Sequence, residues 1–405
     1  MGALLLRDLA QVATAAPSSP GPARGADLRA VDVIEDAYIL CRGDAIAAVG
    51  RMRDLEPIVG EVEELDCSGL SAVPGLVDCH THPAFGGDRV GEFSLRAGGA
   101  SYEELHAAGG GILSTVAATR ALTPTALLER VERHAAWMLA HGTTTWEGKS
   151  GYGLDHDTEL VSLEAVRAAG GSPTWLGAHA VPPEHDDADA YLDYVLADVL
   201  PEAARLAVAA DVFLERSAFD AAHARRFLEG CRAAGLALRL HGDQFTESGA
   251  VPLAIELGAR SVDHLEATGA VGVEALGYSD VVAVLLPASA LFLDRPMPPA
   301  RALVDAGAAI ALATDFNPGS AFTTSLPLIA SLACTKLHLA PEETLVAMTV
   351  NAAHVVGLSD RGRLAPGMRA DVTLLAAPDW RYLAYYLDGD LVSAVVRGGT
   401  TVYRR

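Results

Sequence analysis

The stretch Val73-Pro74-Gly75-Leu76-Val77-Asp78-Cys79-His80-Thr81-His82 predicts both the fold and the chemistry of this chain. Val73 to Cys79 is an apolar run with a Pro-Gly turn, which is typical of a buried strand. The run ends in two histidines spaced i, i+2, and such residues point to the same side of an extended chain. The stretch therefore predicts two imidazoles that can share one metal ion beyond the end of a strand. The alternative is two unrelated loop histidines.

Further apolar runs along the chain alternate with helical patterns. The eight candidate strands are residues 73–79, 143–148, 173–178, 211–216, 237–241, 260–264, 281–286 and 308–314. The candidate helices are 124–140, 157–169, 188–208, 220–234, 248–257, 268–276, 298–306 and 341–356. Eight strands that are each followed by a helix predict an α/β fold of the (β/α)8 TIM-barrel type, and a doubly wound sheet is the alternative.

The two ends of the chain differ from its centre. Both consist of short alternating runs broken by Gly and Asp, such as residues 44–49 and 391–399, which is typical of a small β layer. We therefore expect residues 1–68 and 361–405 to form one composite β-sandwich domain. The barrel domain, residues 69–360, is then inserted between them.

A barrel carries its functional groups at the C-terminal ends of its strands, and here those ends are polar. They hold His80, His82, His179, His241, Asp263, His264 and Asp315. Any one of these residues could have a purely structural role, but the set as a whole favours a site. Three imidazoles and one carboxylate, from His80, His82, His241 and Asp315, make a shell suited to one Zn²⁺ or Fe ion per chain. Such an ion activates water near neutral pH, so hydrolysis is the expected use, with His264 as proton carrier or oxyanion donor.

Three loops at these strand ends are candidate substrate contacts. Arg89 follows the two histidines closely, and its guanidinium can hold a carboxylate with two hydrogen bonds. The Gly-rich segment 147–153 lacks the arrangement of a phosphate-binding loop. Residues 317–320 are either a plain turn or part of a substrate rim.

Charge and composition restrict the partners. A formal charge of −22 argues against nucleic acid and against an anionic membrane surface. No apolar run approaches the roughly 18 residues of a membrane span. Five cysteines without a CxxC pair fit a reducing compartment, so we expect a cytoplasmic protein that acts on a small-molecule substrate. The oligomeric state, including a homodimer, is left open.

The pattern of strand-end residues resembles the amidohydrolase superfamily, and the lack of a strand-four lysine resembles its single-metal members. Further segments, listed here, resemble the members that open the ring of imidazolone propanoate: 78–82, 85–89, 109–112, 114–116, 149–154, 176–179, 262–265, 284–287 and 313–320. The resemblance implies hydrolysis of that cyclic amide to N-formimino-L-glutamate in L-histidine degradation. It also implies the metal ligands His80, His82, His241 and Asp315, and the substrate contacts Arg89, Tyr152, His179, Asn317, Gly319 and Ser320.

Residue 244 departs from one form of the family pattern, since this chain has Gln244 where some relatives have glutamate. An amide cannot act as a base, so we assign the proton transfer to Asp315, the oxyanion to His264, and a ring nitrogen of the substrate to Gln244. A ring deaminase of the same superfamily is the alternative function. A catalytically idle metal-binding protein is a third reading.

Overall fold

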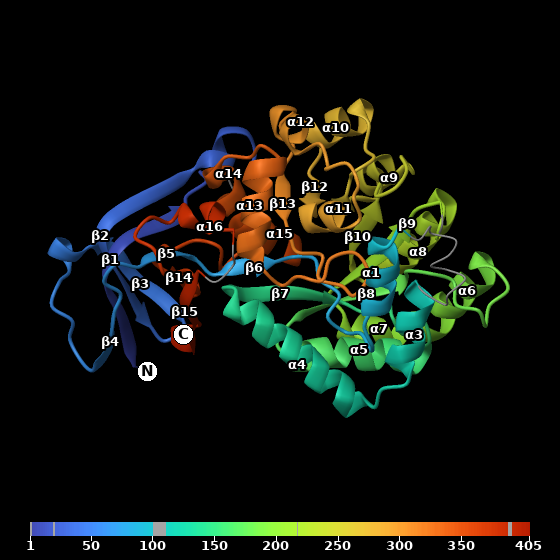
Figure 1. Cartoon of the computed structure of the whole chain (residues 1–405), viewed down its shortest axis with the longest axis horizontal. Coiled ribbons are helices and arrows are strands. Elements are labelled where there is room, and N and C mark those ends of the chain that lie inside the picture. The colour runs from blue at the N-terminus through green and yellow to red at the C-terminus, as the bar shows by residue number, and fades with distance from the viewer. Residues whose placement is uncertain (1, 19–20, 100–110, 217, 388–390) are drawn as a thin grey trace.

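The computed structural model describes residues 2–18, 21–99, 111–216, 218–387 and 391–405. The segment 109–112, which contributed to the family resemblance, therefore has Gly109 and Gly110 outside the described residues. The strands form two separate sheets, one built from the two ends of the chain and one from its centre. Figure 1 shows the first sheet in blue and red at the left and the second at the right, surrounded by helices.

The sheet at the left combines both ends of the chain. Its order is β16-β15-β14-β5-β1-β2-β3, with β4 also paired to β1. Buried side chains from these strands, among them Leu6, Ile39 and Val372, pack into a common apolar cluster. The strands are β1 Ala3–Ala15, β2 Val31–Arg42, β3 Ala45–Arg51, β4 Val62–Asp66, β5 Ser71–Pro74, β14 Val372–Leu375, β15 Val392–Arg397 and β16 Thr400–Arg404.

The central sheet confirms the predicted barrel, with eight parallel strands in sequence order. They are β6 Leu76–Asp78, β7 Thr143–Lys149, β8 Ser172–Ala178, β9 Ala209–Leu214, β10 Ala237–Gly242, β11 Ser261–His264, β12 Val282–Leu285 and β13 Ile310–Leu312. The first and last strands meet just beyond their C-terminal ends. There the backbone N–H of Asp315 donates to the backbone carbonyl oxygen of His80 (3.1 Å), and the backbone N–H of His82 donates to that of Phe316 (2.9 Å). Closure of the barrel thus brings the two histidines to Asp315.

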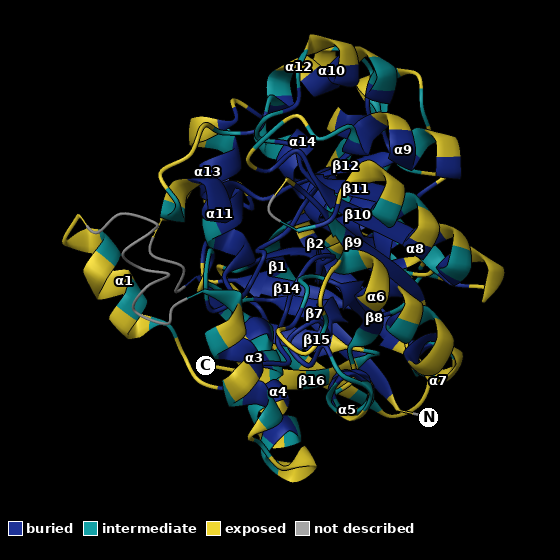
Figure 2. Ribbon diagram, turned by 90° about the vertical axis from the view of Figure 1, so that its right-hand side faces the viewer, coloured by how far each residue is buried: buried dark blue, intermediate teal, exposed yellow. Residues whose placement is uncertain are grey.

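Helices cover the barrel, and their outer faces are exposed while the strands are buried (Figure 2). They are α1 Val90–Ala97, α3 Ile112–Arg120, α4 Pro124–Ala140, α5 His156–Ala168, α6 Ala188–Tyr194, α7 Leu200–Leu206, α8 Ala221–Ala233, α9 Ala250–Leu257, α10 Ala270–Gly277, α11 Pro287–Phe292, α12 Ala300–Asp305, α13 Leu326–Lys336, α14 Pro341–Val346, α15 Ala352–Val356 and α16 Tyr382–Tyr385. Short 3₁₀ turns occupy Gly25–Arg29 and Met52–Asp54. The predicted helices 188–208 and 341–356 are each interrupted by a π-helical segment, Val195–Val199 and Ala347–Asn351.

The predicted strand 73–79 is divided between the two sheets. β5 pairs with β1 and β14 of the terminal sheet, whereas β6 pairs with β7 of the barrel. Gly75 stands between them, and a Cβ there would lie 2.3 Å from the Thr144 hydroxyl, so only glycine fits. We propose this glycine as the boundary between the terminal domain and the barrel.

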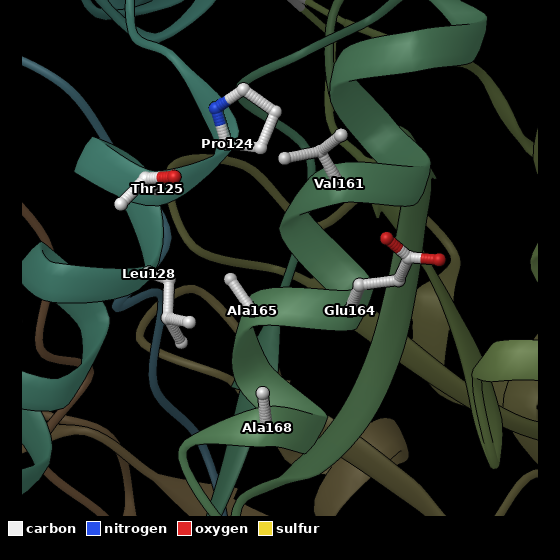
Figure 3. A pocket seen from close by; sticks show the side chains of 7 residues that line it. All are labelled: Pro124, Thr125, Leu128, Val161, Glu164, Ala165 and Ala168. Atoms are coloured by element: carbon white, nitrogen blue, oxygen red, sulfur yellow. The ribbon is translucent and has the colours of Figure 1, made fainter.

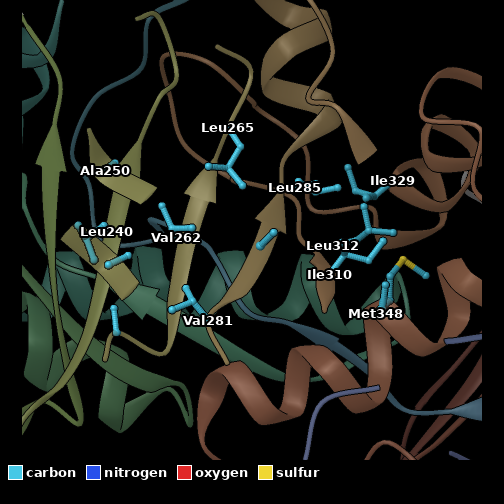
Figure 4. Packing of buried hydrophobic residues seen from close by; sticks show 14 of the residues in the cluster. Leu240, Ala250, Val262, Leu265, Val281, Leu285, Ile310, Leu312, Ile329 and Met348 are labelled. Atoms are coloured by element: carbon cyan, nitrogen blue, oxygen red, sulfur yellow. The ribbon is translucent and has the colours of Figure 1, made fainter. Parts of the chain in front are cut away.

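An apolar core lies between the barrel strands and the covering helices. Leu240, Val262 and Leu285 project from three strands toward the covering helices, where Ile329 and Met348 pack (Figure 4). Burial of these side chains is the main stabilising term for such a sheet. Among the described residues, no helix combines the length and the hydropathy that crossing a bilayer requires.

Candidate active site

Four predicted metal ligands converge at the C-terminal end of the barrel. His82 Nε2 lies 3.3 Å from both His80 Nε2 and His241 Nε2. Asp315 Oδ1 lies 3.6 Å from His80 Nε2 and 3.4 Å from His82 Nε2. All four side chains are buried. His264 also joins this group, because a ring nitrogen of His80, His241 and His264 lies within 4.8 Å of each of the others.

The spacing of these atoms fits a metal ion. Tetrahedral ligands at bond lengths of about 2.1 Å are roughly 3.4 Å apart from one another, close to the separations seen here. Nitrogen lone pairs that face each other at such distances repel unless a cation or a proton lies between them. The set of imidazoles with one carboxylate matches Zn²⁺ or Fe and excludes a thiolate site.

Two buried carboxylates orient the ligand imidazoles. Asp263 Oδ2 lies 2.5 Å from His80 Nδ1, and Asp211 Oδ1 lies 3.0 Å from His241 Nδ1. If each Nδ1 carries the proton and donates it to its carboxylate, each Nε2 presents a lone pair to the metal position. Asp211 has no counterpart among the predicted residues. Its signal in the sequence is a charged residue inside an otherwise apolar strand, Ala209–Leu214.

The electrostatics of the site favour neutral imidazoles and an ionised carboxylate. Burial lowers the pKa of His80 and of His82, so both stay neutral. Burial opposes ionisation of Asp315, but the hydrogen bond with His82 and the surrounding imidazoles lower its pKa overall. His264 differs, since the Glu266 carboxylate raises its pKa in spite of burial. His264 therefore carries a proton more readily than His80 or His82 does.

Arg89 is held at the rim by helix α3 and by a glycine. Its Nε donates to the Thr115 hydroxyl at 3.0 Å. On the other side, a Cβ on Gly319 would lie 2.4 Å from Arg89 Nη1, so the missing side chain makes room for the guanidinium. Gly319 thus shapes the position of Arg89. Thr115 was part of a sequence segment to which no role had been assigned.

Tyr152 and His179 lie together beside the ligand His82. The ring centroids of Tyr152 and His179 are 5.3 Å apart, and that of His179 is 5.8 Å from that of His82. His179 Nδ1 lies 2.9 Å from the carbonyl oxygen of Gly151. If it donates this hydrogen bond, Nε2 is left as an acceptor. Burial raises the pKa of Tyr152, so its hydroxyl stays protonated and can donate a hydrogen bond.

The loop that carries Tyr152 is fixed by Glu159, a buried carboxylate of helix α5. Glu159 Oε1 accepts hydrogen bonds from the backbone N–H groups of Gly151 (3.0 Å), Gly153 (2.8 Å) and Leu154 (3.0 Å). Sequence reasoning did not find this residue, because a glutamate in the first turn of a helix is common for other reasons. Glu159 converts a Gly-rich segment into a rigid support.

The predicted contacts Asn317 and Ser320 organise their own turn. Asn317 Nδ2 donates to the Asp315 carbonyl (2.6 Å) and to Ser320 Oγ (2.7 Å). Asn317 Oδ1 accepts from the backbone N–H groups of Gly319 and Ser320, both at 2.8 Å. Ser320 Oγ in turn donates to Asp315 Oδ2 at 3.3 Å. The turn thereby connects the rim to a metal ligand.

Gln244 follows β10 in a turn that acidic side chains hold from both sides. Asp243 accepts hydrogen bonds from the backbone N–H and the hydroxyl of Ser248. Glu215 accepts from the backbone N–H groups of Phe245 (2.9 Å) and Thr246 (3.1 Å). Gln244 is 8% exposed and stands on this fixed turn, which begins directly after the strand that carries His241.

A separate pocket lies between helices α4 and α5 and does not contain the site (Figure 3). Its lining residues are apolar apart from Thr125 and Glu164, and Glu164 is the one titratable residue among them. Its lining residues are Pro124, Thr125, Leu128, Val161, Glu164, Ala165 and Ala168. Predicted metal ligands and substrate contacts are absent from this set.

Comparison with known proteins agrees with this geometry. Residues 71–402 match the model of the amidohydrolase family. Among solved structures, a zinc-containing adenosine deaminase from Xanthomonas campestris covers 98% of this chain and 92% of its own, with a TM-score of 0.71 and 18% identity. An A. niger ochratoxinase covers 100% and 96%, with a TM-score of 0.69 and 17% identity. At such identities these structures show the fold alone.

Curated sequences are much more similar. The imidazolonepropionase of Rubrobacter xylanophilus is 59% identical over 98% of this chain and 97% of its own length. That of Chloroflexus aggregans is 45% identical over 98% of both. The chain therefore belongs to the amidohydrolase family and, within it, to the imidazolonepropionases.

Proposed function

We propose that this chain hydrolyses the ring amide of 4-imidazolone-5-propanoate to N-formimino-L-glutamate, a step of L-histidine degradation. The proposal is supported by the distances of 3.3–3.6 Å that connect His80, His82, His241 and Asp315. It is also supported by the similarity of the chain to imidazolonepropionases. The same relatives do not favour the alternative of a ring deaminase. The complete ligand set argues against an idle binding protein.

The metal would be one Zn²⁺ or Fe ion per chain, held by those four side chains. When bound, such an ion polarises the substrate carbonyl and lowers the pKa of water to about 7. Asp263 and Asp211 would keep the rings of His80 and His241 aimed at it.

The protein's own residues divide the remaining work. Asp315 directs Oδ1 at the ligand histidines, and its Oδ2, which also accepts from the Ser320 hydroxyl, would accept the proton of the attacking water. As the water oxygen bonds to the ring carbonyl carbon, His264 donates a hydrogen bond to the developing oxyanion. The carbon–nitrogen bond then breaks, and the proton held by Asp315 passes to the departing ring nitrogen. Gln244 holds a ring nitrogen in register during these steps.

The propanoate would be gripped at the rim. In a chain with a net charge of −22, a carboxylate needs a dedicated cation, and Arg89 supplies it. Among the residues that the structure describes, the Arg89 side chain donates its hydrogen bond through Nε to Thr115, so both Nη groups would bind the substrate carboxylate. Tyr152 and His179 complete the grip, next to the turn formed by residues 317–320.

The test is a direct assay of turnover. Enzymatically made imidazolone propanoate should lose its ultraviolet absorbance when the zinc- or iron-loaded protein is added, and N-formimino-L-glutamate should accumulate. Release of ammonia without that product would support the deaminase instead. Stoichiometric metal without turnover of the substrate would support the binding protein.

Finer features belong to the same proposal. We infer a cytoplasmic enzyme with a small-molecule substrate, without nucleic acid or membrane as partner. The five cysteines are all free thiols in this structure, which is compatible with a reducing compartment. A homodimer is compatible with these features.

A further inference from the structure

Lys149 is chemically unusual in this chain. Of 30 basic residues only Lys149 and Lys336 are lysines. Lys336 is exposed at the end of α13, whereas Lys149 is fully buried in β7. Burial of an ammonium group costs free energy unless hydrogen-bonding and charged partners compensate it. The contacts of Lys149 therefore indicate its role.

Lys149 contacts the carboxylate that orients a metal ligand. Its Nζ lies 2.8 Å from Asp211 Oδ2, and the other oxygen of Asp211 accepts from His241 Nδ1 at 3.0 Å. Although burial opposes the charge, Asp211 and Glu147 raise the pKa of Lys149, so the ammonium persists. The contacts form a continuous path from Lys149 through Asp211 to His241.

The same ammonium also reaches the strand with the other two histidines. Lys149 Nζ lies 2.8 Å from Glu147 Oε1, and Glu147 Oε2 accepts from the backbone N–H of Thr81 at 3.2 Å. Thr81 is the residue between His80 and His82. Arg239 extends this layer, because its Nη1 lies 3.2 Å from Glu147 Oε1 and donates to the Cys79 carbonyl at 3.0 Å. The buried charges thus contact both the Asp211–His241 pair and the backbone of the segment that carries His80 and His82.

We propose that Lys149 is a positioning residue that sets metal affinity by holding Asp211 against His241. A compact ammonium fits between two carboxylates at 2.8 Å, where a planar guanidinium would need a wider space. Without Lys149, Asp211 keeps the hydrogen bond from the backbone N–H of His241 (3.2 Å) but loses its cationic partner, so the carboxylate holds the His241 ring less firmly. This inference rests on the metal site of the proposed function.

The experiment measures zinc affinity in the full-length chain, by extraction of Zn²⁺ from the loaded protein with a chromophoric chelator. Lys149→Met keeps the length of the side chain and removes the charge, and we expect Kd to rise about 10- to 100-fold. Lys336→Met, which removes the other lysine, is the matched control and should keep the wild-type Kd. Near-ultraviolet circular dichroism reports whether each variant is folded.

A double-mutant cycle tests whether Lys149 acts through Asp211. Lys149→Met with Asp211→Asn removes one charge of each sign, so this variant keeps the charge balance even if Lys149→Met alone does not fold. The Kd of the combined variant should match that of Asp211→Asn alone within about twofold, because Lys149 can no longer act on His241 once the Asp211 carboxylate is lost. A wild-type Kd in folded Lys149→Met, or a further tenfold loss in the combined variant, would overturn the inference. A wild-type chain that binds neither zinc nor iron stoichiometrically would instead overturn the proposed function.

Discussion

The metal centre and the substrate rim are built in different ways. The candidate ligands His80, His82 and His241 stand at or just beyond strand ends, are almost fully buried and are braced by buried charges. Arg89 and Tyr152 stand on loops and are braced by a hydroxyl and by a carboxylate that accepts backbone N–H groups. The difference predicts two classes of mutational effect. Changes at the centre should remove metal and turnover, and changes at the rim should weaken substrate binding while the metal stays.

The largest effect is expected for loss of a metal ligand. His80→Ala and His241→Ala each leave an incomplete shell, so they should lose most of the metal and nearly all turnover. Elemental analysis of the purified variants measures the metal content. If both variants kept a full complement of metal, the ligand assignment would have to be abandoned.

The next effect separates chemistry from metal binding within the centre. His264→Asn should keep its metal while kcat falls by at least about 10²-fold, because one oxyanion donor is lost. Gln244→Ala should lose chiefly substrate affinity, and Gln244→Glu should change modestly. Steady-state kinetics, combined with metal analysis, distinguish a loss of kcat from a loss of substrate affinity. If His264→Asn kept a near-normal kcat and metal-loaded Gln244→Ala had no measurable turnover, Gln244 and not His264 would take part directly in the chemical step.

At the rim, the largest effect is expected for Arg89. A charge-assisted bidentate pair contributes about 1.5–3 kcal/mol, or roughly 10- to 150-fold in affinity, so Arg89→Ala should raise KM by that factor. Arg89→Lys should also raise KM more than it lowers kcat, because an ammonium cannot form the two parallel hydrogen bonds of a guanidinium. Steady-state kinetics on the metal-loaded variants measure both constants. An unchanged KM in Arg89→Ala would show that Arg89 does not bind the substrate propanoate.

The same comparison explains what the sequence could predict. The eight strands, and the positions of His80, His241 and Asp315 at strand ends on one face of the barrel, followed from apolar runs that end in polar residues, because a barrel collects its strand ends at one face. The supporting roles of Asp211, Lys149 and Glu159 were not predicted, although Lys149 lies in a segment that carries the family resemblance. Their partners lie on other strands or loops, so their roles depend on register and loop conformation, which periodicity does not encode. The division of residues 73–79 between two sheets was missed for a similar reason, since a continuous apolar run does not reveal which neighbours each half pairs with.

Glu159 allows a finer test of the rim. Glu159→Gln keeps the shape but replaces the carboxylate that accepts three backbone N–H groups, and neutral hydrogen bonds are about half as strong. We expect KM to rise about tenfold, with the metal content unchanged, because Tyr152 loses its fixed position. Glu164→Gln, an exposed position on the same helix, is the matched control. Equal kinetics in the two variants would mean that the loop does not depend on Glu159.

The smallest expected effect concerns Thr115, which touches Arg89 and no metal ligand among the contacts described above. Thr115→Val keeps the volume of the buried side chain but removes the acceptor of the Arg89 Nε hydrogen bond. An average hydrogen bond contributes about 0.5–1.5 kcal/mol, so KM should rise roughly 2- to 12-fold while kcat and zinc content stay near wild type. Thr115→Ser restores a hydroxyl at the same place and should recover most of the affinity. The combination with Arg89→Ala sharpens the test, because Thr115→Val should add nothing once the guanidinium is gone. An additive effect in that background, or no recovery by serine, would show that Thr115 supports the rim through packing and does not aim Arg89 at the propanoate.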